Sequence, residues 1–358
     1  MGRKKSDINE NNIIEVNEEY EKYDIETITP SKTGLQKIKS VDKNDIKTMV
    51  KLFYETQRLR IIANGTVTAG TKNNEEAIVD AFAEDVLDYK KIEKNISNQL
   101  QAICKSQEVG RWLLSIKGIG PVLAAGLLSY FDITKAEYAS AFISYAGLND
   151  NNRPWLGREK SEKILNEILD GRKTITDEDV IEYAAKTGWK YNYFVKNAYN
   201  EKTDKWSKSE LVKASSKIPY NKELKVLLWK VGCSFEYQKN KEDSVYGRLL
   251  AERLTYETKM NEEGAYADQA KKKLEEYNIG KDTVAYSYYI EGKLPPAHIR
   301  MRALRWVEKI LVSHLFEEMY RVQYNKVPPR YYALEHLEGE HNIDIEPEVP
   351  YYAVPENE

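Results

Sequence analysis

The sequence contains few cysteines and no long apolar run, and both absences limit the class of protein. Its 358 residues include two cysteines, Cys104 and Cys233, which are too few for a disulfide framework and form no Cys-x-x-Cys pair. No stretch approaches the roughly 18 consecutive apolar residues that would span a bilayer. Residues 1–26 contain no apolar core followed by small residues, so they do not resemble a secretory signal. These absences predict a cytoplasmic protein without a membrane segment.

An excess of positive charge is also lacking. The chain has 54 Lys and Arg residues and 57 Asp and Glu residues, a formal net charge of -3. This balance excludes a histone-like protein that coats nucleic acid through its overall charge, so any nucleic-acid site must be a local one. A hydrophobic fraction of 41% and a charged fraction of 31% are typical of a globular protein with a substantial core.

Apolar residues recur at helical spacing over most of the chain, which predicts a mainly α fold. A first helix should end in the Gly- and Thr-rich segment ANGTVTAGTKN, residues 63–73, and a second, amphipathic helix should cover 74–108. This second helix either pairs with another copy of the chain, making a homo-oligomer, or folds back on the first. The predicted parts are a disordered arm (1–41), a helical hairpin or coiled-coil-like part (42–108), a helix-hairpin-helix part (109–157), an inserted helical module (158–214), the remainder of the core (215–345) and a tail (346–358).

The stretch SIKGIGPVLAAGLL, residues 115–128, places two glycines and a proline between apolar runs. This pattern predicts a helix, a tight hairpin and a second helix that starts at Pro121, where the missing N–H removes no hydrogen bond. The glycines leave the backbone bare, so N–H groups at the start of the second helix can face a phosphate. A close-packed helical corner is the alternative. The candidate nucleic-acid contacts here are Lys117, Gly118, Ile119, Gly120 and Val122.

The stretch PPAHIRMRALRWVEKILVSHLFEEMYRVQ predicts one long basic helix over residues 297–323. One face is apolar and includes His314, which we expect in the core. We expect Glu308 to pair with cations of the adjacent face, whose ridge suits phosphate contact or, alternatively, is only solvated charge. The ridge consists of His298, Arg302, Arg305 and Lys309.

A pair of histidines near the C-terminus, His336 and His341, lies beside two glutamates. Their spacing lacks the i, i+4 geometry that would aim both imidazoles at one ion from a helix, so a structural turn is favoured over a metal site. We therefore expect neither a metal nor another cofactor.

Three segments, LLSIKGIGPVLAAGLLSYFDI, FISYAGL and NKELKVLLWKVG, resemble the C-terminal domain of insertion-sequence transposases of the DEDD kind. This group is associated with bridge-RNA-guided recombination, and the resemblance extends to short transposase-like proteins of phages and bacterial genomes. It covers residues 43–157 and 215–345. The resemblance implies a DNA-binding protein of mobile-element origin, and Arg153, which follows the Gly-Leu turn at 147–148, joins the candidate nucleic-acid contacts.

Two departures from this family argue against catalysis. Residues 1–110 show no β-rich ribonuclease-H-like start with metal-binding aspartates, and Leu156 stands before Gly157 where the resembling transposases carry a serine nucleophile. Ser161 lies nearby, but its place at the start of a helix favours an exposed residue without a chemical role. The resemblance therefore implies a protein that has lost the transposase chemistry.

The inserted module, residues 158–214, contains the segment TITDEDVIEYAAKTGWKYNYFVKNAYN. Its spacing predicts two short helices around a Gly turn, which resemble a helix-turn-helix in outline. We expect Trp189 and Tyr193 to form a miniature core rather than to stack on bases. Binding of DNA and binding of a protein partner both stay open for this module.

Three functions follow from these patterns. The favoured one is a non-catalytic nucleic-acid-binding protein, with DNA preferred to RNA, that holds the phosphate backbone through its helix-hairpin-helix. The second is an active transposase or recombinase whose catalytic residues the sequence does not reveal. The third is a phage protein that acts on a host complex through the inserted module.

Overall fold

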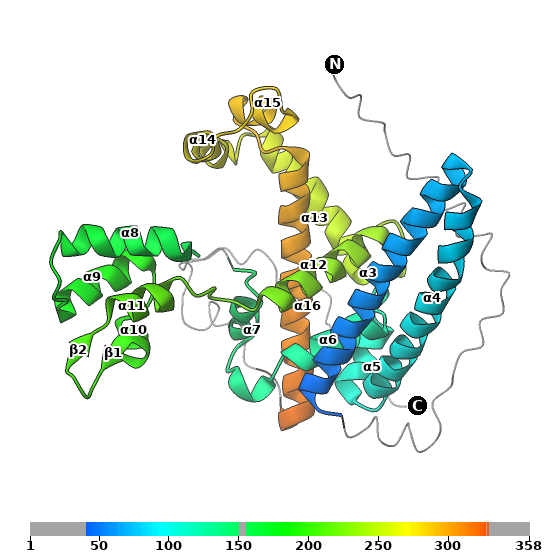
Figure 1. The fold of residues 1–358 in the computed structure, drawn as a ribbon, viewed down its shortest axis with the longest axis horizontal. Coiled ribbons are helices and arrows are strands. Elements are labelled where there is room, and N and C mark those ends of the chain that lie inside the picture. The colour runs from blue at the N-terminus through cyan, green and yellow to red at the C-terminus, as the bar shows by residue number, and fades with distance from the viewer. Residues whose placement is uncertain (1–40, 150–154, 327, 329–358) are drawn as a thin grey trace. The chain divides into compact units, whose positions relative to one another are not determined.

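Helices form most of the structure, a computed structural model that describes residues 41–149, 155–326 and 328. The predicted mainly α class is confirmed, because strands in these ranges are limited to the short antiparallel pair β1 (Tyr199–Asn200) and β2 (Lys205–Trp206) (Figure 1). The chain divides into two compact units after Gly110. The predicted tail, and all but the last residue of the predicted arm, lie outside the described residues.

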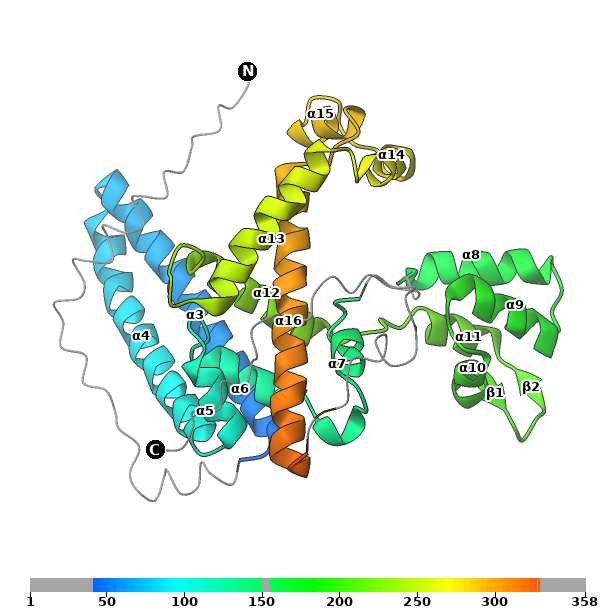
Figure 2. The same cartoon turned by 180° about the vertical axis from the view of Figure 1, so that it is seen from behind.

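The first unit contains a pair of long helices, α3 (Lys43–Asn73) and α4 (Glu76–Lys105), which lie side by side (Figures 1 and 2). Asp42 caps α3, because its carboxylate accepts hydrogen bonds from two backbone N–H groups of the first turn. The chain reverses at Asn74, which adopts a left-handed conformation with φ 57°. The helical-hairpin form of this part therefore agrees with the spacing of its apolar residues.

The loop predicted over residues 63–73 is wrong, because α3 continues through it to its last residue. The threonines in the segment donate their side-chain hydroxyls to carbonyl oxygens four residues earlier, which suits a helix. Gly70 lies where α4 approaches closely, and a Cβ atom there would be 3.1 Å from the Val79 side chain. The glycine thus serves helix packing rather than a turn.

The core of the second unit surrounds one long helix, α16 (Pro296–Tyr324), which agrees with the predicted helix over 297–323 (Figure 2). Its N-terminal residue follows Pro295 in an extended conformation, as expected for a helix that starts after a proline pair. Three helices pack on α16: α13 (Val245–Glu262), α12 (Lys222–Tyr237) and α7 (Ala139–Tyr145). A further helix, α6 (Pro121–Tyr130), packs on α12.

The buried residues of α16 include two side chains that the sequence analysis singled out, His314 and Glu308. His314 lies in the core as expected, and its Nδ1 atom is 2.8 Å from the hydroxyl of Tyr246. Glu308 is 2% exposed and its Oε1 atom has no hydrogen-bond partner among the described residues, so its predicted pairing with the neighbouring cations is wrong. A Cβ atom at Gly232 would lie 2.6 Å from that oxygen, which shows how closely α12 covers the carboxyl group.

Two short helical segments follow α6. A 3-10 turn, η2 (Ile133–Lys135), comes first and α7 follows. After α7, Gly147 turns with φ 69° against Tyr220, whose Cγ would lie 2.5 Å from an added Cβ atom. The N–H of Asn221 donates to the carbonyl of Tyr145 at 2.9 Å. The Gly-Leu turn is thereby fixed to the start of α12.

Residues 157–216, which contain the predicted inserted module (158–214) and are called the insert below, fold around a core of their own. The residues at the centre of this core, Tyr183, Phe194 and Leu211, are completely buried. Trp189 stacks on Tyr193 at 4.3 Å between ring centroids, so these aromatic residues form a miniature core as expected. Its helices are α8 (Gly157–Leu169), α9 (Asp177–Thr187), α10 (Tyr191–Ala198) and α11 (Lys208–Ser215).

A smaller cluster lies where α13 ends and α16 begins. There α14 (Ala267–Glu276) packs on α15 (Val284–Ile290). The side chain of Asn261 closes the cluster by accepting a hydrogen bond from the N–H of Leu294 at 2.8 Å and donating one to its carbonyl at 2.9 Å.

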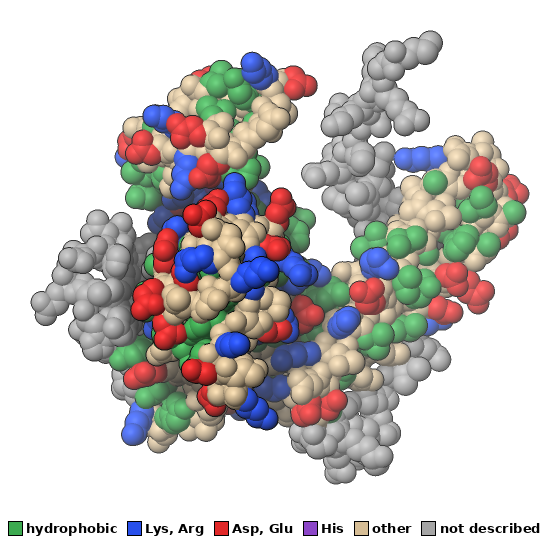
Figure 3. Space-filling model, turned by 60° about the vertical axis from the view of Figure 1, so that its left-hand side comes forward, with side chains coloured by type: hydrophobic (Ala, Val, Ile, Leu, Met, Phe, Trp, Pro, Cys, Tyr) green, Lys and Arg blue, Asp and Glu red, His purple; other side chains and the backbone are tan. Residues whose placement is uncertain are grey.

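The surface carries charges of both signs, interspersed over the face in Figure 3, as the near-neutral composition predicts. Within the described residues, no helix is long and apolar enough to cross a membrane.

Candidate nucleic-acid interface

The hairpin between α5 (Glu108–Ser115) and α6 is held against α12. Gly118 has φ +101°, a conformation that glycine adopts without strain, and an added Cβ atom would lie 3.1 Å from the Phe235 ring. Its carbonyl accepts a hydrogen bond from the hydroxyl of Ser234 at 2.6 Å. Ile119 is buried and its N–H donates to the carbonyl of Ile116 at 2.9 Å. The turn is therefore rigid, and Gly118 has a structural role in it.

The start of α6 keeps free N–H groups. Gly120 is exposed and occupies the N-cap position in an extended conformation, but it has no side chain to cap the helix. Pro121 follows, and the first intrahelical bond runs from Ala124 to the Gly120 carbonyl at 3.0 Å. Among the described residues, none accepts a hydrogen bond from the backbone N–H of Val122 or Leu123. The positive end of the helix dipole therefore lies at the exposed Gly120, whereas Val122, another predicted contact, is buried.

Lys117 has an acidic partner that the sequence did not reveal. Its ammonium group forms an ion pair with Asp243, on the loop that precedes α13. The hydrogen bond from Lys117 lowers the pKa of the Asp243 carboxyl, so that carboxylate stays charged at neutral pH. The aspartate is 68% exposed, which places a negative charge beside the hairpin. Lys117 contributes less to anion attraction than a free lysine would.

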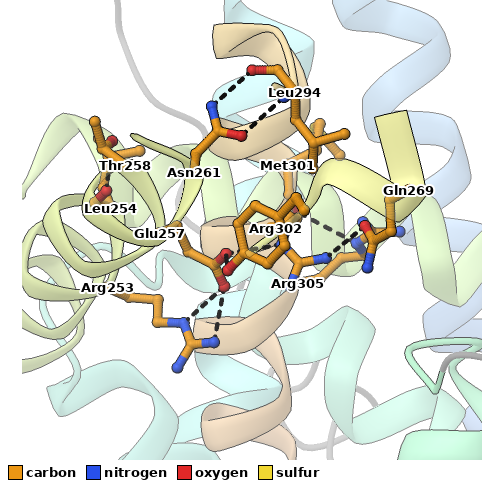
Figure 4. A network of polar contacts seen from close by, with 11 residues as sticks. Arg253, Leu254, Glu257, Thr258, Asn261, Gln269, Leu294, Met301, Arg302 and Arg305 are labelled. Carbon is orange, nitrogen blue, oxygen red and sulfur yellow. Dashed lines mark hydrogen bonds and ion pairs between the residues drawn. The ribbon is translucent and has the colours of Figure 1, made fainter. Parts of the chain in front are cut away.

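On α16, Arg302 is tied into a buried network (Figure 4). Its Nε donates to Glu257 at 2.7 Å, its Nη1 donates to Gln269 at 3.2 Å, and its guanidinium lies 4.2 Å from the ring centroid of Tyr266. Arg253 donates two further hydrogen bonds to the same glutamate, at 2.7 and 3.0 Å. One carboxylate therefore fixes two guanidinium groups.

Glu257 stays ionised in this network. Burial alone raises the pKa of its carboxyl group, but hydrogen bonds from Tyr266, Arg302 and Arg253 outweigh burial and hold the pKa below its ordinary value. Removing this carboxylate would leave two arginines without their shared partner, which is a costly change in a buried position.

A small cavity of about 100 Å³ lies beside the network. Its lining holds four cationic side chains and one carboxylate, so its potential favours an anion. The structure brings the three predicted cations Arg302, Arg305 and Lys309 together here, while His298 does not line the cavity. The lining consists of Leu148, Arg253, Glu257, Arg302, Arg305, Trp306 and Lys309.

Sequence reasoning missed Arg253 because it lies on α13, about 50 residues before the basic ridge of α16 in the sequence. The i, i+4 spacing of Arg253 and Glu257 predicts an ion pair within a helix, but not that Arg302 joins it from a second helix. Three residues named in the sequence analysis, Arg153, His336 and His341, fall outside the described residues.

Ser161 lies inside the insert and is completely buried, so the expected exposed position is wrong. Its carbonyl accepts a hydrogen bond from the hydroxyl of Tyr183 at 3.0 Å, and its own hydroxyl has no partner among the described residues. Within the ranges that the structure describes, no group of three or more His, Cys, Asp or Glu side chains is arranged to hold a metal ion.

Comparison with known proteins finds one family model that matches the segment containing the hairpin. Residues 110–153 match the Transposase IS116/IS110/IS902 family. This transposase-like segment contains the hairpin, α6, α7 and the Gly-Leu turn, and it includes Leu148 of the cationic cavity. No curated protein and no solved structure gives a significant match to the chain.

Proposed function

We propose that this protein binds nucleic acid, DNA in preference to RNA, by holding the phosphate backbone, and that it does so without catalysing strand transfer. The observation that carries the proposal is the uncapped start of α6 inside the transposase-like segment. Its N–H groups and helix dipole suit a phosphate oxygen. Such a contact reads no bases, so binding should tolerate most sequences.

The cationic cavity supports the same proposal from a second element. Arg305 and Lys309 lie about one turn apart on α16. Leu148 brings the end of the transposase-like segment to the same cavity. Arg253 and Arg302 are held in place by Glu257, so the rotamer entropy lost on binding an anion there is small. Arg302 has three partners, whereas the Nε atom of Arg305 donates one hydrogen bond, to the Met301 carbonyl at 3.2 Å. We therefore take Arg305, together with Lys309 of the same cavity, as the candidates for phosphate contact.

Two residues, Leu156 and Ser161, are the reason that we propose a protein without catalytic activity. Leu156 occupies the position before Gly157 where the resembling transposases have their nucleophile, and a leucine side chain offers no nucleophilic atom. Ser161, the nearest alternative, is completely buried and out of reach of a nucleic-acid strand.

The predicted origin, location and self-association of the protein are part of this proposal. A phage or mobile-element origin and a cytoplasmic location agree with a transposase-like DNA-binding protein. The exposed apolar side chains of α3 and α4, among them Leu59, Ile62 and Phe82, support association of two copies of the chain through these helices.

Fluorescence anisotropy with single-stranded, duplex and branched DNA and with structured RNA, at two salt concentrations, tests the proposal. We expect the wild type to bind and its affinity to fall with salt. The double variant Arg305→Glu, Lys309→Glu should bind at least about tenfold more weakly with a smaller salt slope, whereas Lys271→Glu, Lys281→Glu, which reverses two exposed charges elsewhere, should resemble wild type.

Two results would contradict this account. A wild type that binds none of these nucleic acids, or binds them independently of salt, removes phosphate recognition. Cleavage or joining of DNA in the presence of Mg²⁺ removes the non-catalytic part and revives the recombinase alternative.

A further inference from the structure

The insert presents a polar groove that the transposase-like segment does not share. Among the described residues, the helices of the insert make their extensive contacts with one another. The insert therefore holds its shape through its own core. Arg172 and Asp179, joined by hydrogen bonds of 2.6 and 3.1 Å, fix α9 to the segment that follows α8. A groove on this module therefore has rigid walls.

Two helices of the insert meet in a tight turn. Only residues 188–190 separate α9 from α10, and Gly188 ends α9 with φ 70°. Three-residue turns that contain glycine are typical of a helix-turn-helix. Phe194 and Ala198 bury one face of α10, while Asn192, Lys196 and Asn197 are exposed on it. The Nδ2 atom of Asn197 already donates to the carbonyl of Tyr193 at 2.7 Å. Asn192 and Lys196 are therefore the side chains that this helix offers outward.

A β-hairpin follows α10 directly. Its two strands pair Tyr199 with Trp206, whose ring centroids are 4.9 Å apart. The indole N–H of Trp206 donates to Asp177 at 2.7 Å, which anchors the hairpin to the first turn of α9. Lys202 lies in the exposed connection between the strands. The hairpin stands beside α10 as a second wall.

The groove between α10, this hairpin and the start of α11 has a volume of about 880 Å³. Asparagine and lysine side chains dominate its polar lining, together with Glu201 and Glu210. The second of these glutamates is already paired with Lys213 at 3.1 Å. The groove lining includes Asn192, Lys196, Asn197, Asn200 and Lys202.

Charge is distributed unevenly over the insert. Residues 183–216 contain seven lysines and three acidic residues, whereas residues 157–182 contain five basic and eight acidic residues. The charged side chains that line the groove are Lys196, Lys202, Glu201 and Glu210. The preference for an anionic partner therefore comes from the excess of lysines in the surrounding half of the insert.

We propose that this groove binds duplex DNA, with α10 in the major groove and the β-hairpin on the adjacent backbone. Asn197 donates to the Tyr193 carbonyl and the Oδ1 atom of Asn200 accepts from the N–H groups of Lys202 and Thr203. The amide of Asn192 is the group that can donate to and accept from base edges, and the lysines suit phosphates. This contact would add sequence preference to a protein whose α6 hairpin reads only backbone. It does not depend on the contact proposed for that hairpin.

Binding of a labelled duplex of random sequence to the full-length chain tests the inference. The groove variant Lys196→Glu, Lys202→Glu should lower affinity by at least about tenfold. The control variant Lys160→Glu, Lys163→Glu makes the same charge change at exposed sites of α8 and should stay near wild type. All four lysines are exposed, so thermal melting should show an intact fold for both variants.

A selection of bound sequences from a random pool gives the second readout. Asn192→Ala should change or erase the selected sequence preference while total affinity falls little. An unchanged selected sequence together with equal affinities of the groove and control variants would overturn the inference. Retained duplex binding with loss of binding to polyglutamate in the groove variant would assign the groove to an acidic protein instead.

The failure of this inference is distinguishable from failure of the proposed function. If Gly120→Asp weakens duplex binding and the groove variant does not, the inference fails and the proposed function stands. If only the groove variant weakens binding, the insert carries the contact and the α6 proposal fails. A wild type that does not bind duplex overturns the inference.

Discussion

Individual cations along this chain differ in how much charge they offer a ligand. Lys117 pairs with Asp243, which lies 126 residues later, and Arg302 pairs with Glu257, which lies 45 residues earlier. The sequence predicted the cations but not these partners, because nothing local to either residue encodes a contact over such a separation. The carboxylates therefore decide which predicted cations are available to a phosphate.

Asp243→Asn tests this point for the hairpin. The change removes a negative charge beside the uncapped start of α6 and releases Lys117 from its ion pair. We expect nucleic-acid affinity to rise several-fold at low salt, with a salt slope larger by about one. Anisotropy titrations at several salt concentrations measure both quantities.

The matched control is Asp80→Asn, which removes an exposed aspartate from α4. It should leave affinity close to wild type. Equal affinities of Asp243→Asn and wild type would show that Lys117 and its partner lie outside the interface.

At the scale of helices, the best sequence predictions rest on long uninterrupted periodicity. The α16 helix was predicted nearly to the residue because a proline pair precedes it and no breaker follows. The end of α3 was predicted wrongly because Gly70 and the neighbouring threonines are common in loops, and only the approach of α4 shows that they serve packing. The buried position of Glu308 was missed since its neighbours in sequence are cations.

Glu308 makes the packing of α16 on α12 sensitive to pH. Burial raises the pKa of its carboxyl group to about 8, against the opposing effect of Arg305 and Lys225. The folded protein therefore keeps this proton up to about pH 8, whereas the unfolded chain loses it near the ordinary value of 4.5. The stabilising contribution is complete below that lower pKa and is lost as pH rises through the folded pKa.

Urea unfolding of wild type and Glu308→Gln from pH 6.5 to 8.5 measures this effect. The wild-type free energy of unfolding should fall with a slope of up to about 1.4 kcal/mol per pH unit, and the variant should be flatter by that amount. Burial lowers the pKa of His314 to about 4, so its titration lies below this window. Parallel curves for the two proteins would show that Glu308 is ionised in the folded state.

For the whole molecule, the sequence predicted the class of fold and the start of a helix at Pro121, but not how distant elements combine. The transposase match covers residues 110–153, while the cationic cavity joins Leu148 of that segment to side chains of α13 and α16. Such a combination depends on tertiary packing, and no periodicity in the sequence encodes it.

Phosphate recognition by this protein depends on the open start of α6. Gly120→Asp closes it without disturbing the fold, because φ is -85° there and an added Cβ atom would meet no atom within 4 Å. An aspartate at this N-cap position accepts hydrogen bonds from the first N–H groups of the helix and places a negative charge where a phosphate would lie. Gly120→Asn is the matched control, since it caps the same groups without charge.

The decisive measurement is the affinity of these two variants and wild type for duplex DNA at low salt, with the melting temperature of each. We expect Gly120→Asp to melt at or slightly above the wild-type temperature and to bind at least about tenfold more weakly, with Gly120→Asn between the two. Wild-type affinity in a well-folded Gly120→Asp protein would contradict phosphate recognition at the start of α6.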